Sequence, residues 1–427
     1  MLVIGAGGRE HAIAWRLAQD GHVVTSSPGN AGMDATGAER VTLDLSDQRS
    51  VVDQVKQSRV DMVVIGPEQP LADGLADRLT QAGIKTFGVG REAARLEGSK
   101  SFAKEVMVAA GVPTGDHALF DDADAALRYL DGVDGPVVVK ADGLAAGKGV
   151  TVATDRDEAA AAVLRCLVDR SFGEAGELVL IEECLRGYEI SMIALADEQT
   201  IVPLAPAQDF KRAGDGDTGP NTGGMGCYSP VPHFGDELVE LAMERVLRPT
   251  LKELARRGIV FRGVIYAGLM MTDDGPKVLE FNCRFGDPET QAILPRLRGG
   301  FSDALEATAD GRLSEIDIEW STESCVDVVL ASQGYPGAYP TGLPISGCDE
   351  ASSREGVSLF HAGTESDDRG IVTSGGRVIN VSALGGDLSE ARTRAYGAVT
   401  ALSFKGMHYR TDIAESAASL VAAGERS

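Results

Sequence analysis

Over roughly the first hundred residues, short apolar runs alternate with amphipathic stretches. Residues 2–4 form an apolar run that leads into Gly5-Ala6-Gly7-Gly8 and then into a helical pattern through Ile13 and Leu17. Because strands that alternate with helices build parallel sheets, this region predicts a parallel sheet with its functional loops at the carboxyl ends of the strands. The further elements predicted here are strands at 23–26, 60–65 and 84–89, and a helix from Glu68 to about Ala82.

From about residue 97 the pattern changes to strands joined by glycine-rich loops. A helix over 99–110 ends at Gly111, with Pro113 beyond it as a normal stop signal. The stretch 213–226 (AGDGDTGPNTGGMG) is too rich in glycine to be anything but a loop. The other predictions are strands at 136–140, 150–153, 178–182 and 189–195, a long amphipathic helix near 236–257, and a hairpin of 263–271 with 277–283 turned at Asp274-Gly275.

Beyond about Cys325 the chain is rich in strand patterns again. Strands are predicted at 326–330 and 377–382, and a helix near 388–402. We interpret this part as a small α/β domain that closes the chain. The whole is therefore predicted to be an α/β protein with domains at 1–98, 99–324 and 325–427.

The excess of acidic residues limits the classes of partner that the chain is expected to bind. With 64 Asp and Glu against 40 Lys and Arg, the formal net charge is −24, so neither nucleic acid nor an anionic membrane surface is expected as a partner. An anionic substrate must meet locally placed cations. A nucleotide with Mg²⁺ fits this, because carboxylates can hold the metal while a few Lys and Arg hold the phosphates.

The cysteines and the first residues of the chain indicate its cellular compartment. The six cysteines are scattered without a C-x-x-C pair, and we interpret them as buried thiols in a reducing compartment. The start, MLVIGAGG, lacks the charged region and cleavage site of a signal peptide, and no apolar run reaches membrane-spanning length. We therefore expect a cytoplasmic protein.

The segment 277–289 (KVLEFNCRFGDPE) offers a candidate metal site. Side chains alternate along a strand, so Glu280 and Asn282 point one way while Leu279 and Phe281 point the other. Two hard oxygen ligands suit Mg²⁺, which completes its shell with water and phosphate, and Arg284 follows on the same face. A solvated edge strand would explain the two residues alone, but the run RFGDPE directly after them favours a functional site.

The loop 140–149 (KADGLAAGKG) is a candidate phosphate site. It places Lys140 and Lys148 around small residues, so that backbone N–H groups can approach a phosphate. It is not a Walker A motif, because Gly149 stands where that motif has Ser or Thr. A bare hairpin loop is the alternative, although a lysine that closes an apolar strand favours function.

Three weaker signals remain. The acids of 181–189 (IEECLRGYE) could accept from ribose hydroxyls, but a solvated turn explains them as well. The opening GAGGREH lacks the third glycine of a dinucleotide fingerprint, while Arg9 and a helix N-terminus could still bind phosphate, and His11 is interpreted as an ordinary helix residue. Asp209 and Lys211 border the glycine-rich loop, either as substrate contacts or as its hinge.

Taken together, these segments resemble the family of phosphoribosylamine–glycine ligases. The resemblance covers nearly the full chain, and its most specific motifs are DTGPNTGGMG and EFNCRFGDPETQ. The other matching segments, in order, are VIGAGGREHAIAW, PGNAG, GPEQPLADG, LEGSK, KADGLAAGKGV, IEECLRGYE, QDFKR, FRGVIYAGLM and FHAGT.

The resemblance implies a fold and a reaction. The fold would be an ATP-grasp architecture, with a Rossmann-like N-terminal domain, a two-part core with a mobile lid at about 119–188, and the small C-terminal domain. The reaction would join glycine to 5-phosphoribosylamine in purine biosynthesis, with ATP as co-substrate and Mg²⁺, or Mn²⁺ in its place, as cofactor. We expect a monomer or a weak homodimer.

The resemblance also implies roles for particular residues. For ATP these are Lys100, Lys140, Lys148, Glu182, Glu183, Leu185 and Glu189. For the metal they are Glu280 and Asn282. For phosphoribosylamine and glycine they are Gly8, Arg9, Asn30, Glu68, Lys211, Asn221, Thr222 and Gly223, with Asp209 and Arg284 placed at the reacting groups.

Two departures from the family pattern bear on the site. Phe210 stands in QDFKR where the family usually has His, and the strand 264–271 lacks the second metal-binding acid common in ATP-grasp enzymes. Glu280 is therefore expected to contribute more of the metal binding than in relatives. The alternative hypotheses are that the chain is another ATP-grasp ligase of purine metabolism, a nucleotide-binding protein without catalysis, or a nicotinamide dehydrogenase.

Overall fold

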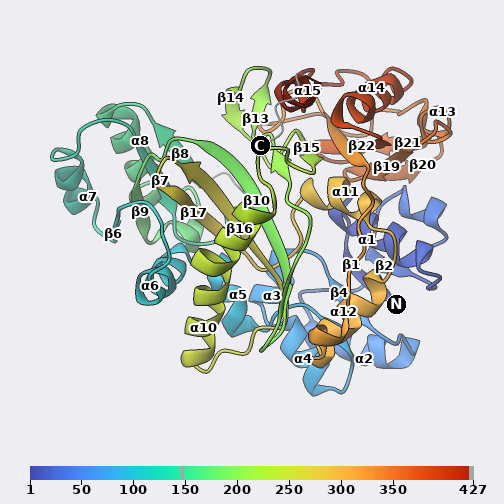
Figure 1. Cartoon of the computed structure of the whole chain (residues 1–427), viewed down its shortest axis with the longest axis horizontal. Helices are drawn as coiled ribbons and strands as arrows, with labels where there is room; N and C mark the ends of the chain where they lie inside the picture. Colours follow the sequence, from blue (N-terminus) through green and yellow to red (C-terminus); the bar gives the residue numbers. More distant parts are fainter. Residues whose placement is uncertain (146–148, 423–427) are drawn as a thin grey trace.

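The computed structural model describes residues 1–145 and 149–422 of the chain. In Figure 1 the amino-terminal elements (blue) and the carboxyl-terminal elements (orange to red) lie on one side of the molecule, and the elements around residues 117–183 (teal) project on the other. Strands β10 and β16 run between these two parts. Within the described ranges, no helix has both the length and the apolar character needed to cross a membrane.

The first part is the predicted parallel sheet, with strand order β3-β2-β1-β4-β5. Its single predicted helix after Glu68 is in fact two, because Gly74 adopts a left-handed conformation (φ 83°) that starts α4 afresh. The strands are β1 (Leu2–Gly5), β2 (Thr25–Pro28), β3 (Glu39–Arg40), β4 (Val63–Ile65) and β5 (Thr86–Phe87); the helices are α1 (Gly8–Gln19), α2 (Gln48–Ser58), α3 (Glu68–Ala72) and α4 (Leu75–Gln81).

The projecting part has an antiparallel sheet and a core of its own. Helix α5 (Arg91–Gly98) and helix α6 (Lys100–Ala110) lead into it, and Ser99 caps α6 by accepting a hydrogen bond from the Phe102 N–H. The sheet order is β6-β9-β7-β8, and helices α7 and α8 pack on it around Val139, Val163 and Ile181. The elements are β6 (His117–Phe120), α7 (Ala123–Leu130), β7 (Val137–Ala141), β8 (Val150–Ala153), α8 (Arg156–Leu167) and β9 (Val179–Glu183).

A second antiparallel sheet, ordered β11-β10-β16-β17, contains the predicted hairpin. The predicted strands at 178–182 and 189–195 exist, but β9 and β10 belong to these two different sheets. The long amphipathic helix is also confirmed, with a π-helical stretch at Met243–Leu247 between its two α-helical parts. The elements are β10 (Tyr188–Ala196), β11 (Ile201–Pro203), α9 (Asp236–Ala242), α10 (Arg248–Arg256), β16 (Gly263–Thr272) and β17 (Gly275–Asn282).

The third part is a sheet ordered β12-β15-β18-β22-β19 under helices α14 and α15. Two of its strands, β12 and β15, come from the chain before Cys325. The elements are β12 (Gln208–Asp209), β15 (Gly226–Ser229), β18 (Ser324–Ala331), α13 (Cys348–Ser352), β19 (Val357–His361), β20 (Thr364–Asp367), β21 (Gly370–Thr373), β22 (Arg377–Gly385), α14 (Leu388–Val399) and α15 (Glu415–Ala422), and helices α11 (Glu289–Ile293) and α12 (Phe301–Asp310) precede β18.

The prediction that 213–226 is only a loop is wrong. Residues Arg212–Gly214 (β13) and Thr218–Asn221 (β14) form a two-stranded hairpin. The turn between them uses left-handed conformations at Gly216 (φ 64°) and Asp217 (φ 54°). Glycine here permits a tight turn rather than preventing strands.

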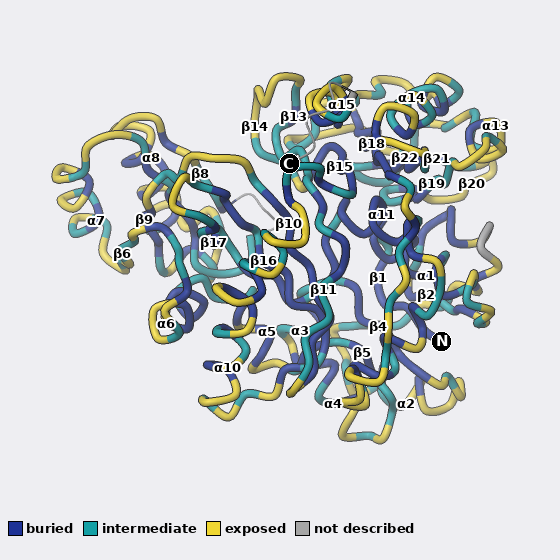
Figure 2. Tube along the Cα trace, viewed as in Figure 1, coloured by how far each residue is buried: buried dark blue, intermediate teal, exposed yellow. Residues whose placement is uncertain are grey.

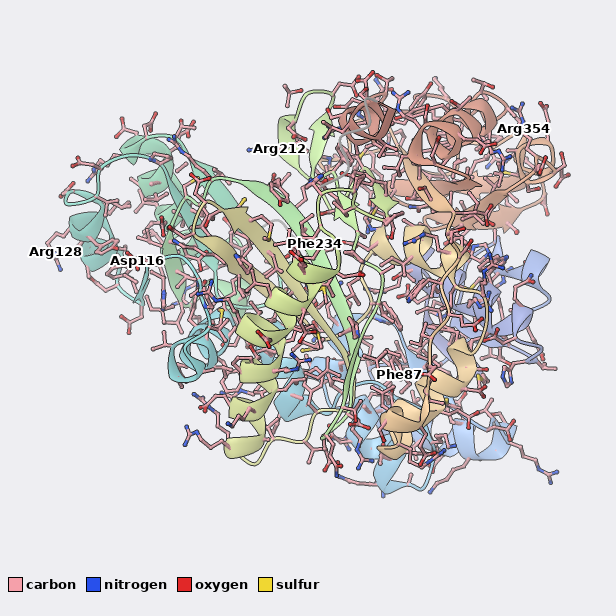
Figure 3. All side chains as sticks on the ribbon, viewed as in Figure 1. Phe87, Asp116, Arg128, Arg212, Phe234 and Arg354 are labelled. Atoms are coloured by element: carbon pink, nitrogen blue, oxygen red, sulfur yellow. The ribbon has the colours of Figure 1, made fainter. Side chains whose placement is uncertain are left out.

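The buried core follows the central strands. Figure 2 shows dark blue stretches along β1, β10, β16 and β18, and exposed loops at the edges of the molecule. In Figure 3 the buried Phe234 lies near the middle, while Arg128 on α7 and Arg354 lie toward opposite ends.

Candidate active site

Strand β17, which was predicted to hold the metal, contains a β-bulge. Leu279 has no cross-strand partner, because the register with β16 shifts by one residue at this point. Val278, rather than Leu279, therefore packs into the core together with Phe281. The prediction that Leu279 shares the apolar face is wrong, since a bulge moves the preceding side chains to the other face.

Beyond the bulge the predicted polar face is present. Phe281 is buried, so Glu280 and Asn282 on either side of it point away from that core. Arg284 lies on the same side, because its Nη2 donates to Asn282 Oδ1 at 3.2 Å. The strand thus presents a carboxylate, an amide and a guanidinium together.

Four cations lie close enough to Glu280 to act on its charge. Burial by itself would raise the pKa of Glu280, but Lys211, Lys140, Lys100 and Arg284 together lower it. These cations come from four separate segments of the chain. Glu280 therefore stays ionised beside four cations, which can serve a polyanionic ligand.

The donor set at this point fits a magnesium ion. Across the described ranges, no group of three or more His, Cys, Asp or Glu side chains is placed to hold a metal, and β16 has no acid in its sequence GVIYAGLMMT. Glu280 and Asn282 offer two hard oxygen ligands. Mg²⁺ accepts so few protein ligands, because it keeps waters and substrate phosphates in its shell.

A buried trio of charged side chains, Lys104, Lys140 and Glu182, lies at the end of β7. Lys140 Nζ lies 2.5 Å from Glu182 Oε2, and Lys104 Nζ lies 2.6 Å from Glu182 Oε1. Burial by itself would raise the pKa of Glu182, but the two lysines lower it. Lys100 lies nearby and donates to the Gly143 carbonyl at 3.2 Å. The other predicted lysine of this loop, Lys148, lies outside the described residues.

A second charged cluster joins three parts of the chain around Arg284. Its guanidinium lies 3.0 Å from Glu97 and 3.6 Å from Glu68, which also lies 3.9 Å from Arg9. Burial raises the pKa of Glu97, although Arg284 and the Cys283 N–H oppose the rise. The pKa of Glu68 is lowered because Arg284 and Arg9 outweigh the effect of burial.

The glycine-rich segment is fastened from both sides. The Thr222 N–H donates to the Lys211 carbonyl at 2.7 Å, and Lys211 Nζ lies 2.9 Å from Asp209 Oδ2. On the other side, the Gly223 N–H donates to the Tyr335 hydroxyl at 3.0 Å, and Arg377 donates to the Gly223 carbonyl at 2.6 Å. Asn221 is the last residue of β14, directly before these contacts.

The predicted phosphoribosylamine residues lie at the amino end of α1. Asn30 is buried, and its amide donates to the carbonyls of Ala6 and His361 at 2.8 and 2.7 Å while accepting from Gly32. Gly8 starts α1, where a Cβ would lie 2.6 Å from Gln291 Nε2. A larger residue at this position would therefore require the ends of the Gln291 and Asn380 side chains to shift.

The predicted adenine and ribose residues follow β9. Glu183 is the exposed end of that strand, 3.7 Å from Lys277 Nζ. Leu185 lies beside Gly115 in the segment between the two antiparallel sheets, and Glu189 stands in β10. Phe210, which replaces the family's histidine, packs against the core, and the Arg410 guanidinium lies 4.8 Å from its ring centroid.

Sequence reasoning missed five residues of the site. Glu97, Lys104, Glu289, Tyr335 and Arg377 were given no role, although the first and third stand within the motifs LEGSK and RFGDPETQ. Glu289 is buried and accepts from Ser191 and Tyr266, each at 2.9 Å. The motif RFGDPETQ could have indicated Glu289. The position of Lys104 one helical turn after Lys100 could have indicated Lys104.

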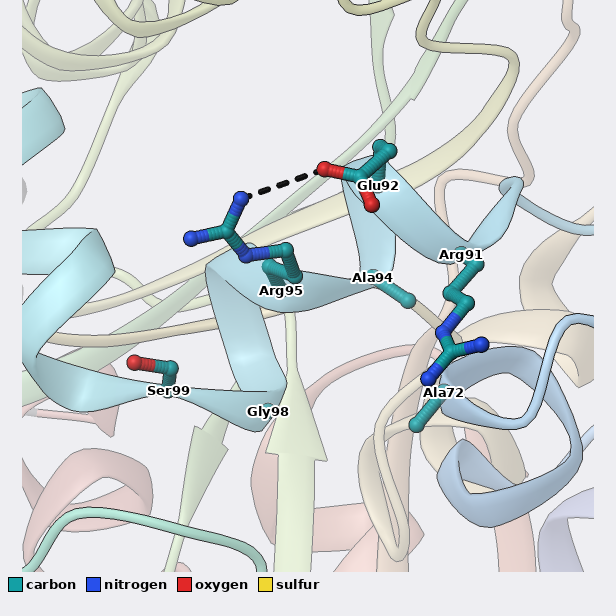
Figure 4. Close-up of a pocket in the computed structure, with 7 residues that line it drawn as sticks. All are labelled: Ala72, Arg91, Glu92, Ala94, Arg95, Gly98 and Ser99. Atoms are coloured by element: carbon teal, nitrogen blue, oxygen red, sulfur yellow. Dashed lines mark hydrogen bonds and ion pairs between the residues drawn. The ribbon is translucent and has the colours of Figure 1, made fainter.

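A separate pocket of about 450 Å³ lies on α5 (Figure 4). Arg95 Nη1 and Glu92 Oε2 form an ion pair there at 3.1 Å. None of the residues predicted for the site lines this pocket, which is formed by Ala72, Arg91, Glu92, Ala94, Arg95, Gly98 and Ser99. It adds nothing to the charged site.

Comparison with solved structures first defines the class. The chain superimposes on a biotin carboxylase domain of Hydrogenobacter thermophilus 2-oxoglutarate carboxylase with a TM-score of 0.72, covering 96% of this chain and 91% of that one at 17% identity. Residues 98–290 match the family model of the ATP-grasp (A) domain of phosphoribosylglycinamide synthetase. The fold is thus that of an ATP-grasp enzyme.

The particular family follows from the whole chain. Residues 1–97 match the N domain and residues 325–416 the C domain of phosphoribosylglycinamide synthetase. A phosphoribosylamine–glycine ligase of Rhizobium meliloti is 47% identical over 415 residues, covering 97% of each chain. One of Thermotoga maritima superimposes with a TM-score of 0.83 at 33% identity, covering 96% of this chain and 99% of that one. The chain belongs to the phosphoribosylglycinamide synthetase family.

The chain also resembles part of a larger protein. It is 48% identical over 418 residues to a trifunctional purine biosynthetic protein of Gallus gallus, and this match spans 97% of the chain but 42% of that protein. The activity of the family is phosphoribosylamine–glycine ligation, a carbon–nitrogen bond formation in purine biosynthesis.

Proposed function

We propose that the chain joins glycine to 5-phosphoribosylamine through glycyl phosphate, releasing glycinamide ribonucleotide, ADP and phosphate. The observation that supports this best is the convergence of Lys100, Lys140, Lys211 and Arg284 on Glu280. A carboxylate is a poor acyl donor, and transfer of a phosphoryl group to it needs several cations to neutralise the charge that develops.

ATP is held by residues of α6, of the segment 140–149, and of the two sheets that contain β9 and β17. In this proposal Lys100, Lys140 and Lys148 hold the phosphates, and Glu280 and Asn282 hold Mg²⁺, or Mn²⁺ in its place. When bound, the metal neutralises phosphate charge and orients the transferred group. The further ATP-binding residues are Glu182, Glu183, Leu185 and Glu189. The separate core of the projecting part supports a lid of about 119–188 that excludes water from the acyl phosphate.

The charged cluster around Arg284 and the glycine-rich segment beside it receive glycine and phosphoribosylamine. Arg284 and Asp209 act at the reacting groups, and Arg284 is held there by Glu97 and Glu68. The substrate-binding residues are Gly8, Arg9, Asn30, Glu68, Lys211, Asn221, Thr222 and Gly223. The ribosyl amine attacks glycyl phosphate and displaces phosphate. No protein nucleophile is required, since positioning and charge neutralisation supply the catalysis.

Each of the three domains of the chain has its own role in this proposal. We assign 1–98 to phosphoribosylamine binding, 99–324 to the ATP-grasp core and 325–427 to the closing domain. The family matches at 1–97, 98–290 and 325–416 support these bounds. The protein acts in the cytoplasm as a monomer or a weak homodimer.

A substrate-omission assay tests this function. ADP release should require Mg²⁺, glycine and phosphoribosylamine together, and chelation of the metal should abolish it. Omission of either acceptor should leave only background turnover, because glycine supplies the phosphoryl acceptor and the amine completes the cycle. ATP turnover that is indifferent to glycine would contradict the proposal.

A further inference from the structure

Lys104 has no assigned role, yet it is among the most buried charged side chains of the ATP-grasp core. Its exposed fraction is 3%. It stands on α6 one turn after Lys100, and its Nζ lies 2.6 Å from Glu182 Oε1 and donates to Thr114 Oγ1 at 2.6 Å. A lysine this deeply buried needs a reason, because burial disfavours its charged form.

Glu182 divides its carboxylate between two lysines. One oxygen faces Lys104 and the other faces Lys140, and the exposed fraction of Glu182 is 6%. The trio therefore contains two ammonium groups and one carboxylate. Had Glu182 only Lys140 as a partner, the pair would be neutral, and a phosphate would have to compete with a buried carboxylate for the same lysine.

The neighbouring backbone reinforces this arrangement. Lys140 Nζ donates to the carbonyl of Leu279 at 3.0 Å, and Leu279 is the bulged residue of β17 without a cross-strand partner. The Thr114 hydroxyl, which accepts from Lys104, donates in turn to the Val278 carbonyl at 2.8 Å. Lys140 directly, and Lys104 through Thr114, are thus fixed against consecutive residues of the strand that leads to Glu280.

We propose that Lys104 is a positioning residue that occupies one oxygen of Glu182 and so leaves a surplus positive charge on Lys140 for the phosphates of the nucleotide. This inference rests on the proposed ATP site and deepens it. Lys104 does not contact the phosphates itself. It acts through Glu182 and Lys140, and it raises the preference of the site for phosphorylated nucleotides over the bare nucleoside.

The test compares affinity for ATP and for adenosine, both measured by calorimetry on the full chain. Lys104→Met should weaken ATP binding about tenfold, the scale of one charge-assisted hydrogen bond. Adenosine binding should stay unchanged, since adenosine carries no phosphate. An equal loss for both ligands, or no loss for ATP, would overturn the proposal. Where Lys104→Met fails to fold in a thermal melt, Lys104→Gln takes its place, because its amide can still bond to Thr114.

A charge-balance rescue separates this role from simple packing. The double variant Lys104→Met with Glu182→Gln again leaves one net positive charge in the trio, so its preference for ATP over adenosine should return to near the parent value. A merely structural role predicts a double variant at least as impaired as Lys104→Met. Lys85→Met is the matched control. Lys85 is likewise held in ion pairs, with Glu306 and Asp310, but it lies in the amino-terminal part and is more exposed than Lys104.

A third variant distinguishes failure of this inference from failure of the proposed site. Lys140→Met should abolish the preference for ATP. If Lys140→Met retains that preference, the assignment of the ATP site is itself wrong. If Lys140→Met loses it while Lys104→Met behaves like the parent protein, only the role of Lys104 is overturned.

Discussion

At the scale of the residue, the site is organised around one carboxylate. Glu280 is flanked by lysines from α6, β7 and the segment after β12, and by Arg284 at the end of its own strand. These four cations lower the pKa of Glu280, whereas burial alone would raise it. Such a group binds a divalent cation without first losing a proton.

Glu280→Gln removes this charge while keeping the size of the side chain. We expect turnover to fall at least 100-fold, because loss of a metal-binding charge costs several kcal/mol of transition-state stabilisation. The fold should persist, because glutamine fills the same space and can still hydrogen-bond to its surroundings. The rate of ADP release, with circular dichroism as the control, measures both. Near-normal turnover would remove Glu280 from the metal site.

At the scale of the element, helix α1 is joined to strand β19 by two buried histidines. The His361 N–H donates to His11 Nδ1 at 2.8 Å, and Asn30 reaches the His361 carbonyl. Burial lowers the pKa of His11 to about 3, with His361 adding to the effect, and burial lowers the pKa of His361 to about 4. Both imidazoles are therefore neutral in the folded protein at neutral pH.

This junction predicts a loss of stability on mild acidification. The unfolded chain takes up protons on both histidines below about pH 6.5, while the folded chain does not until about pH 4, so the free energy of unfolding falls as the pH falls. Between pH 6 and pH 5 the loss should be about 1 kcal/mol for each histidine. His11→Asn keeps the acceptor near Nδ1 and should remove about half of it.

Urea unfolding at pH 7, 6 and 5 measures this effect. The value at pH 7 reports any packing lost in His11→Asn, so it serves as the internal control for the difference between pH 6 and pH 5. A pH dependence identical in the variant and the parent protein would show that His11 takes up its proton equally in both states.

At the scale of the whole molecule, the periodicity of the sequence predicted the helices and strands better than it predicted which strands pair. The parallel sheet, the hairpin of β16 with β17 and the long helix ahead of it are local patterns, and they are confirmed. The sequence gives no local signal that β9 and β10, adjacent in the chain, enter different sheets, or that β12 and β15 join the last sheet. Those pairings depend on long-range burial.

The site shows the same division between local and long-range information. Glu280, Asn282 and Arg284 could be placed together from strand alternation alone. Glu97 could not, because its 3.0 Å contact with Arg284 joins residues 187 positions apart, 284 − 97. The bulge at Leu279 could not be predicted either, since it depends on the register with β16 rather than on the sequence of β17.

The central claim is that the chain activates the carboxylate of glycine as an acyl phosphate. Turnover of glycine labelled with ¹⁸O in both carboxylate oxygens, followed by mass spectrometry of the released phosphate, tests it most directly. One ¹⁸O should appear in each phosphate, because the oxygen that attacks the phosphorus of ATP leaves with it, and the other should remain in the amide of the product. Phosphate free of ¹⁸O would contradict the account.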